Sequence, residues 1–142
     1  MGVIVDTSIW VDVERQRLTH TALADLLGDE PVYLAPPVIA ELEYGVNRAQ
    51  TAGQRNKRAA ALAKIRMKPC LIMDRETGDL FGKLAAELDR KGRPSKHRVN
   101  DLWLAALAIQ HGFRLLTNNP DDFRDVPGLD LIPLPRGQEQ PR

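Results

Sequence analysis

Three widely spaced acidic residues stand where predicted secondary structure elements begin or end. Asp6 directly follows the apolar run Val3-Ile4-Val5, and Asp101 precedes the apolar run 102–109. Glu41 lies in an apolar segment that follows two prolines. Taken singly, each acid is explained as a helix cap, a first-turn acid favoured by the helix dipole, or a solvated side chain. Together they predict a functional site if the fold gathers them.

The elements that would position these acids follow from alternating strand and helix patterns. A continuous β-branched run such as 3–5 is typical of a strand buried on both faces of a parallel sheet. Further strands are expected at 32–34, 71–73, 114–117 and 129–132. Helices are expected at 8–13, 19–27, 36–46 and 53–67, one capped by Asp74 and running through Leu88, and one opened by Asn100 and ended by Gly112. Such alternation predicts an α/β fold with a central parallel sheet of four or five strands and helices on both faces.

The chemistry of three gathered acids is that of a divalent cation site. The carboxyl ends of parallel strands lie at one edge of the sheet, where such folds bind ligands. Clustered carboxylates repel one another unless a cation neutralises them. Oxygen ligands suit Mg²⁺, with Mn²⁺ as a substitute. The three histidines are scattered and there is one cysteine, so the sequence shows no zinc-type spacing.

Four segments in order resemble the motifs of the PIN domain, and within it the VapC-type toxins of bacterial toxin–antitoxin pairs. They are Val-Asp-Thr-Ser (5–8), Ala-Glu-Leu-Glu-Tyr-Gly (40–45), Asn-Asp-Leu-Trp-Leu-Ala-Ala (100–106) and Leu-Thr-Asn-Asn-Pro-Asp-Asp-Phe (116–123). The likeness covers about Val3 to Leu134. It implies a three-layer α/β/α PIN-like fold over residues 1–134. The polar tail 135–142, with two prolines, is predicted to be disordered.

The resemblance implies an Mg²⁺-dependent endoribonuclease that acts as a toxin and cleaves RNA phosphodiester bonds through a metal-activated water. The implied metal ligands are Asp6, Glu41 and Asp101. Many PIN domains carry an Asp where this chain has Asn119, so either Asn119 or Asp122 is expected to complete the acidic site. Hydroxyl groups that would hydrogen-bond to the ligands or contact phosphate belong to Thr7, Ser8 and Thr117, although these residues are equally explained as caps and strand-end hydroxyls.

The implied partners are an RNA substrate, a cognate VapB-type antitoxin and a second copy of the chain in a homodimer. Local cations at Arg93, Lys96 and Arg98 border the third motif and are candidates for RNA binding, with a solvated loop as the alternative. The formal net charge of +1 argues against a generally basic nucleic-acid binder. Trp10 and Trp103 have apolar neighbours, which favours packing over base stacking.

The remaining composition indicates a cytoplasmic protein. No apolar run approaches the roughly 20 residues that a membrane span needs, so no membrane association is expected. The single cysteine, Cys70, fits a reducing compartment and is expected to be a small core residue.

Two alternatives remain open from the residues. A non-catalytic PIN-like module that binds RNA or protein is kept open by Asn119. A receiver-like domain phosphorylated at Asp74 is less favoured, because such domains need an acidic pair after the first strand, and this chain has only Asp6 there.

Overall fold

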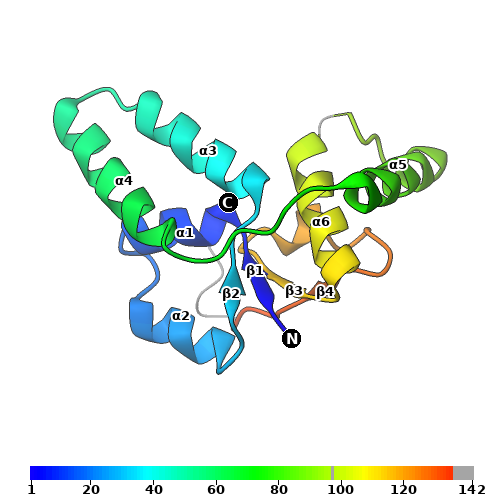
Figure 1. Ribbon diagram of the computed structural model, residues 1–142, viewed down its shortest axis with the longest axis horizontal. Coiled ribbons are helices and arrows are strands. Elements are labelled where there is room, and N and C mark those ends of the chain that lie inside the picture. The colour runs from blue at the N-terminus through cyan, green and yellow to red at the C-terminus, as the bar shows by residue number, and fades with distance from the viewer. Residues whose placement is uncertain (97, 136–142) are drawn as a thin grey trace.

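The computed structural model describes residues 1–96 and 98–135, which fold around a four-stranded sheet (Figure 1). The strands are β1 (Val3–Val5), β2 (Val32–Tyr33), β3 (Arg114–Leu116) and β4 (Asp130–Leu131). Their order across the sheet is β2-β1-β3-β4, and every neighbouring pair is parallel. The predicted α/β architecture with a parallel sheet is confirmed.

Six α-helices surround the sheet, with bounds Thr7–Glu14 (α1), His20–Leu27 (α2), Pro36–Asn47 (α3), Ala52–Ile65 (α4), Arg75–Arg90 (α5) and Val99–His111 (α6). One 3-10 turn, η1 (Pro120–Asp122), follows β3. Figure 1 shows α1, α2 and α4 on one side of the strands and α5 and α6 on the other, which gives the expected three layers. The helical pair α3–α4 extends away from the sheet.

Capping residues account for most helix boundaries. The Thr19 hydroxyl accepts a hydrogen bond from Ala22 at the start of α2, and Asp74 forms a capping box with Thr77 at the start of α5. Gly112 ends α6 in the left-handed region, at φ 67°, where a side chain would be strained. These three boundaries are predicted correctly from the residue types alone.

The core is centred on β1, whose three residues are fully buried between the two helical layers. Helix α6 is buried along most of its length, because Leu102 and the run 104–108 pack against the sheet and α5. Because α6 is apolar on most sides and packed between the sheet and α5, its first turn is fixed relative to the strands. The first turn of α6 carries Asp101.

The strand register determines which side chains meet at the carboxyl edge of the sheet. Val5 of β1 is paired with Leu116 of β3, and the Asp6 amide donates to the Leu116 carbonyl at 2.8 Å. Asp6 and Thr117 therefore leave the sheet side by side, although 111 residues separate them.

The segment 71–73 is not a strand, which corrects one expected element. It follows a single parallel bridge between Leu34 and Cys70, and Ile72 is 78% exposed. This bridge lies next to β2, the edge strand of the sheet, and no further strand covers residues 71–73 from the other side within the described residues. For the same reason Cys70 is exposed rather than a core residue.

Two expectations concern the ends of the chain and its surface. The predicted disordered tail 135–142 lies outside the described residues except for residue 135. Within the described part of the chain, no helix is both long and apolar enough to cross a membrane.

Candidate active site

Asp6 is the most buried of the three acids singled out in the sequence, and three hydrogen bonds hold it. It is 6% exposed and caps α1, where its Oδ1 accepts a hydrogen bond from the Thr7 amide at 2.8 Å. Its Oδ2 accepts from the hydroxyls of Ser8 at 3.0 Å and Thr117 at 2.8 Å. The carboxylate is therefore fixed by both α1 and the end of β3, as a preorganised ligand needs to be.

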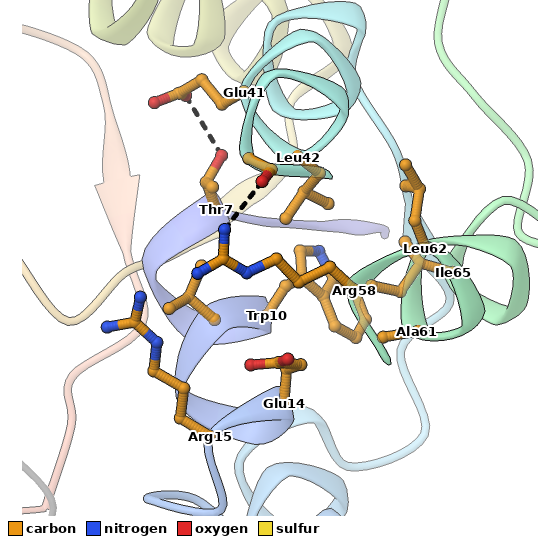
Figure 2. Close-up of a pocket in the computed structure, with 12 residues that line it drawn as sticks. Thr7, Trp10, Glu14, Arg15, Glu41, Leu42, Arg58, Ala61, Leu62 and Ile65 are labelled. Atoms are coloured by element: carbon orange, nitrogen blue, oxygen red, sulfur yellow. Dashed lines mark hydrogen bonds between the residues drawn. The ribbon is translucent and has the colours of Figure 1, made fainter. Parts of the chain in front are cut away.

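Glu41 reaches the same region from the next helix. It lies on α3, and its Oε1 accepts a hydrogen bond from the Thr7 hydroxyl at 3.1 Å. Figure 2 shows the two side chains pointing toward each other between α1 and α3. Thr7 thus binds Glu41 through its hydroxyl and Asp6 through its amide.

An open cavity of about 500 Å³ brings the acids of four elements together. Asp6 comes from the end of β1, Glu41 from α3, Asp101 from the first turn of α6, and Asp122 from η1. The other residues that line this cavity are Thr7, Ser8, Val11, Asp12, Arg17, Asn118 and Asn119. The three acids singled out in the sequence and the fourth-motif residues Asn119 and Asp122 thus all line one cavity.

The protonation equilibria of these acids show that they act on one another. Partial burial and repulsion by Asp6, Asp122 and Glu41 raise the pKa of Asp101 to about 6, and Arg98 opposes this shift. Burial also raises the pKa of Asp6, against the hydrogen bonds from Thr117, Ser8 and Thr7.

The pKa of Glu41 is raised as well. Although the residue as a whole is exposed, loss of solvent around its carboxyl group is the main cause, and repulsion by Asp6 adds to it. The Thr7 hydrogen bond acts in the opposite direction. Negative charge is thus less stable than normal at three positions of the cavity.

The donor set fits a hard divalent cation. All four acids offer carboxylate oxygens, which Mg²⁺ and Mn²⁺ prefer, and a cation would relieve the repulsion that raises their pKa values. Across 1–96 and 98–135, no three His, Cys, Asp or Glu side chains lie close enough together to coordinate an ion as they stand. Like charges keep apart, so ion binding would draw the carboxylates inward.

Asn119 and Asp122 occupy different positions in the fourth motif. The Asn119 amide donates to the Thr117 hydroxyl at 3.0 Å, and Thr117 in turn donates to Asp6. Asp122 is exposed at the end of η1 and repels both Asp6 and Asp101. Asn119 therefore supports the site through its backbone amide, while Asp122 adds a carboxylate to those of Asp6, Glu41 and Asp101.

The three basic residues expected to bind RNA differ in their contacts. Lys96 is exposed. Arg93 and Arg98 both form ion pairs with Asp125, at 3.1 and 2.7 Å. RNA binding by these residues stays a prediction, and the Asp125 contacts give Arg98 a second, structural connection to the site.

The sequence interpretation missed one polar cluster in the wall of the cavity, which includes a fifth acid. Asp12 is 4% exposed, accepts a hydrogen bond from the Asn118 side chain, and lies 3.6 Å from the Arg17 guanidinium. The cluster ties the loop after β3 to α1. An acid between two valines in an apolar helix was the available signal, since a buried carboxylate needs partners.

An apolar groove adjoins the site on its α1 side. We use the name Trp10 groove for two cavities, of about 130 and 860 Å³, that share Trp10, Glu14, Ala61 and Ile65. The smaller cavity, shown in Figure 2, also includes Thr7 and Glu41. Trp10 Nε1 is buried and has no hydrogen-bond partner within the described residues. The groove thus leads from α2 along α4 to a candidate ligand of the site.

Comparison with known sequences gives consistent matches over nearly the whole chain. A family model described as the PIN domain matches residues 3–129. Ribonuclease VapC1 from Rickettsia felis is 31% identical over 137 residues, which cover 93% of this chain and 96% of the relative. Ribonuclease VapC from Rickettsia bellii is 30% identical over 139 residues, with coverage of 95% and 98%.

Solved structures agree with the sequence matches. VapBC2 from Rickettsia felis, in a crystal structure with a DNA fragment from its promoter, has a TM-score of 0.79 and 25% identity, covering 92% of this chain and 97% of that one. VapBC-5 from Mycobacterium tuberculosis has a TM-score of 0.75 and 24% identity, covering 94% and 100%, a likeness that shows the fold alone.

Proposed function

Because this chain belongs to the PIN-domain family, we propose that it is the toxin of a VapBC-type toxin–antitoxin pair and acts as a metal-dependent endoribonuclease. The observation that carries the proposal is the placing of Asp6, Glu41, Asp101 and Asp122 around one cavity. Two relatives at 30% and 31% identity, aligned over nearly their full length, are named ribonucleases. The fold likeness to VapBC2 supports an antitoxin as the partner.

Asp6, Glu41 and Asp101 would hold the ion, with Asp122 completing the acidic site. A divalent cation bound there supplies an activated water and offsets negative charge on the phosphodiester. We propose Mg²⁺ as this ion, with Mn²⁺ as a substitute, because only oxygen ligands line the acidic cavity.

The chain's own residues contribute position and charge. Ser8 and Thr117 fix the Asp6 carboxylate, and Thr7 fixes Glu41. Because burial and repulsion make negative charge costly at these positions, the cavity should attract a cation more strongly than an isolated carboxylate does. The cavity is open to solvent, so an RNA strand can approach it without a change of fold.

The deciding experiment removes one carboxylate at a time. In Asp6→Asn and Asp101→Asn, Mg²⁺-dependent cleavage of RNA should fall to background, because each change removes a proposed ligand without changing side-chain size. Cleavage is measured on total cellular RNA with and without EDTA, and thermal unfolding shows whether each variant is folded.

A matched control is Asp121→Asn. Asp121 is also an acid of η1, but it forms an exposed ion pair with Arg124 and does not line the cavity. This variant should cleave as the wild type does. Full activity in folded Asp101→Asn protein would refute the catalytic assignment.

We further propose that the antitoxin occupies the Trp10 groove. The groove is apolar and meets the acidic cavity at Thr7 and Glu41. It carries Lys57 and Lys64 of α4 and Lys68 just beyond that helix. A partner segment in this position would cover the groove residues beside Trp10 and obstruct access to Glu41. A chain with apolar anchors and acidic or carbonyl acceptors is the chemistry that matches.

Two further parts of the proposal concern assembly and location. The family resemblance implies a homodimer, which light scattering of the purified protein checks directly. The single, exposed Cys70 supports a reducing compartment, and we propose the cytoplasm.

A further inference from the structure

Two of the proposed site acids come from segments that are not strands of the sheet. Asp101 lies in the first turn of α6, whereas Asp122 ends η1, which belongs to the loop after β3. Both acids line the same cavity, where their like charges repel. Leu102 of α6 and Val126 of the loop after β3 share an apolar cluster, and a contact that offsets the repulsion would help this packing to keep the start of α6 beside η1 before a cation arrives.

Arg98 makes that contact. It directly precedes α6 and stands three residues before Asp101. Its Nη1 donates to Asp125 Oδ2 at 2.8 Å, and its Nη2 donates to Asp125 Oδ1 at 2.7 Å and to the Asp122 carbonyl at 2.5 Å. The side chains of Arg98 and Asp125 are each only 18% exposed, so solvent screens the pair less than an ordinary surface ion pair.

We propose that Arg98, held by Asp125, is a positioning residue that keeps Asp101 and Asp122 on the wall of the same cavity, from which a divalent ion can draw them together. This inference rests on the proposed metal-dependent function. It assigns to Arg98 a task different from contacting RNA, because two of its nitrogens are already engaged by Asp125 and Asp122.

The geometry requires arginine. A planar guanidinium can bind both oxygens of Asp125 and a third acceptor at once, whereas a lysine ammonium is a point charge on a flexible chain. The clamp also places a positive charge beside Asp101 and Asp122, since both interact electrostatically with Arg98. Arg93, which is more exposed, adds a second contact to Asp125.

The test measures binding of Mn²⁺ by isothermal titration calorimetry, independently of RNA cleavage. In Arg98→Gln and in Asp125→Asn, the Kd for Mn²⁺ should rise about 10- to 100-fold, the range seen when residues that support metal ligands are lost. The double variant should bind no more weakly than the weaker single variant, because both changes break the same clamp. Arg98→Lys should show an intermediate loss.

A structural ion pair elsewhere separates positioning from stability. Arg114→Gln breaks the pair between Arg114 and Glu30, which is similarly half-buried and lies at the opposite end of β3 from Thr117. This control should lower the thermal midpoint but leave the Mn²⁺ Kd within about twofold of the wild type, because its loss does not affect the acidic cavity.

The outcomes are distinguishable. An Mn²⁺ Kd that is unchanged in folded Arg98→Gln overturns the positioning role while leaving the nuclease proposal in place. Equal Kd increases in Arg98→Gln and Arg114→Gln overturn it too, since general destabilisation would then account for both. Wild-type protein that neither binds Mn²⁺ nor cleaves RNA overturns the proposed function and this inference together.

Discussion

At the scale of single residues, the central feature is the raised pKa of Asp101. The pKa of Asp101 is about 6 in the folded chain, against 3.8 for an unperturbed Asp. The folded state therefore binds this proton more tightly than the unfolded state. The resulting contribution to stability is complete below about pH 3.8 and is lost as the pH rises through 6.

Asp101→Asn should therefore stabilise the metal-free protein. The full pKa difference would correspond to about 3 kcal/mol at about 1.4 kcal/mol per unit. Solvent reaches part of this side chain, so we expect about 1 kcal/mol at pH 7.5. The gain should shrink to about a third at pH 4.5, where wild-type Asp101 is already protonated when folded.

Urea unfolding in EDTA at both pH values measures this difference. Comparing variant and wild type at each pH removes the effect of other acids, such as Asp125, whose pKa is lowered by Arg98. A gain that is the same at pH 4.5 and pH 7.5 would contradict the assigned protonation of Asp101.

Which site residues the sequence could reveal depended on the strand pattern. Asp6 and Asp101 flank strongly apolar runs, so a parallel sheet with a buried helix packed on it predicts that both acids lie near one edge of the sheet. Arg98 and Asp125 are 27 residues apart and both lie outside regular elements. No periodic pattern predicts such a pair, so the sequence gives no sign of the contact between Arg98 and Asp125, and RNA binding by Arg98 stays a prediction.

At the scale of elements, α6 is held in place by its neighbour α5. Thr77 of α5 is fully buried, and its hydroxyl donates to Gln110 Oε1 of α6 at 2.5 Å. Gln110 Nε2 in turn donates to Asp74 Oδ1 at 2.9 Å. The start of α5 is thus tied to the end of α6, far along the helix from Asp101.

Thr77→Val should lower the free energy of unfolding by about 1–3 kcal/mol, because the isosteric change leaves the Gln110 carbonyl and the Asp74 amide without a partner. Urea unfolding measures the loss. Thr21→Val, on the exposed surface of α2, is the control and should stay within about 0.5 kcal/mol of the wild type. An equal loss in both variants would show that the Thr77 network contributes nothing specific.

Element prediction succeeded where cap and pattern agreed and failed where only composition was available. Thr19, Asp74 and Gly112 mark helix boundaries through their own chemistry, so those boundaries were predictable. The run 71–73 is as apolar as a strand, but its burial depends on a neighbour beyond β2 that the chain does not supply. Ile72 is accordingly exposed, and only Cys70 pairs with Leu34.

At the scale of the whole molecule, the proposed antitoxin site in the Trp10 groove can be tested by substitutions outside the acidic cavity. Ala61 of α4 lines both cavities of the groove, and Figure 2 shows it beside Trp10 of α1. A long charged side chain at this position would fill the space that the antitoxin is proposed to occupy.

Ala61→Arg should raise the Kd for the antitoxin about tenfold or more, as blocking a central contact costs more than about 1.4 kcal/mol. Ala59→Arg is the matched control, because Ala59 is exposed on α4 and lines neither cavity. Surface plasmon resonance with the purified antitoxin compares the two, and thermal melting shows whether they are folded. Wild-type affinity in Ala61→Arg would place the antitoxin on another surface.

The pairing of β1 with β3 has a consequence for how the protein is made. The ribosome releases β1 first, but the hydroxyl that fixes Asp6 belongs to Thr117 and follows 111 residues later. Asp101 and Asp122 also emerge late, and domains fold as units once their chain is available. A nascent copy therefore has no assembled acidic cavity until most of its length has been translated.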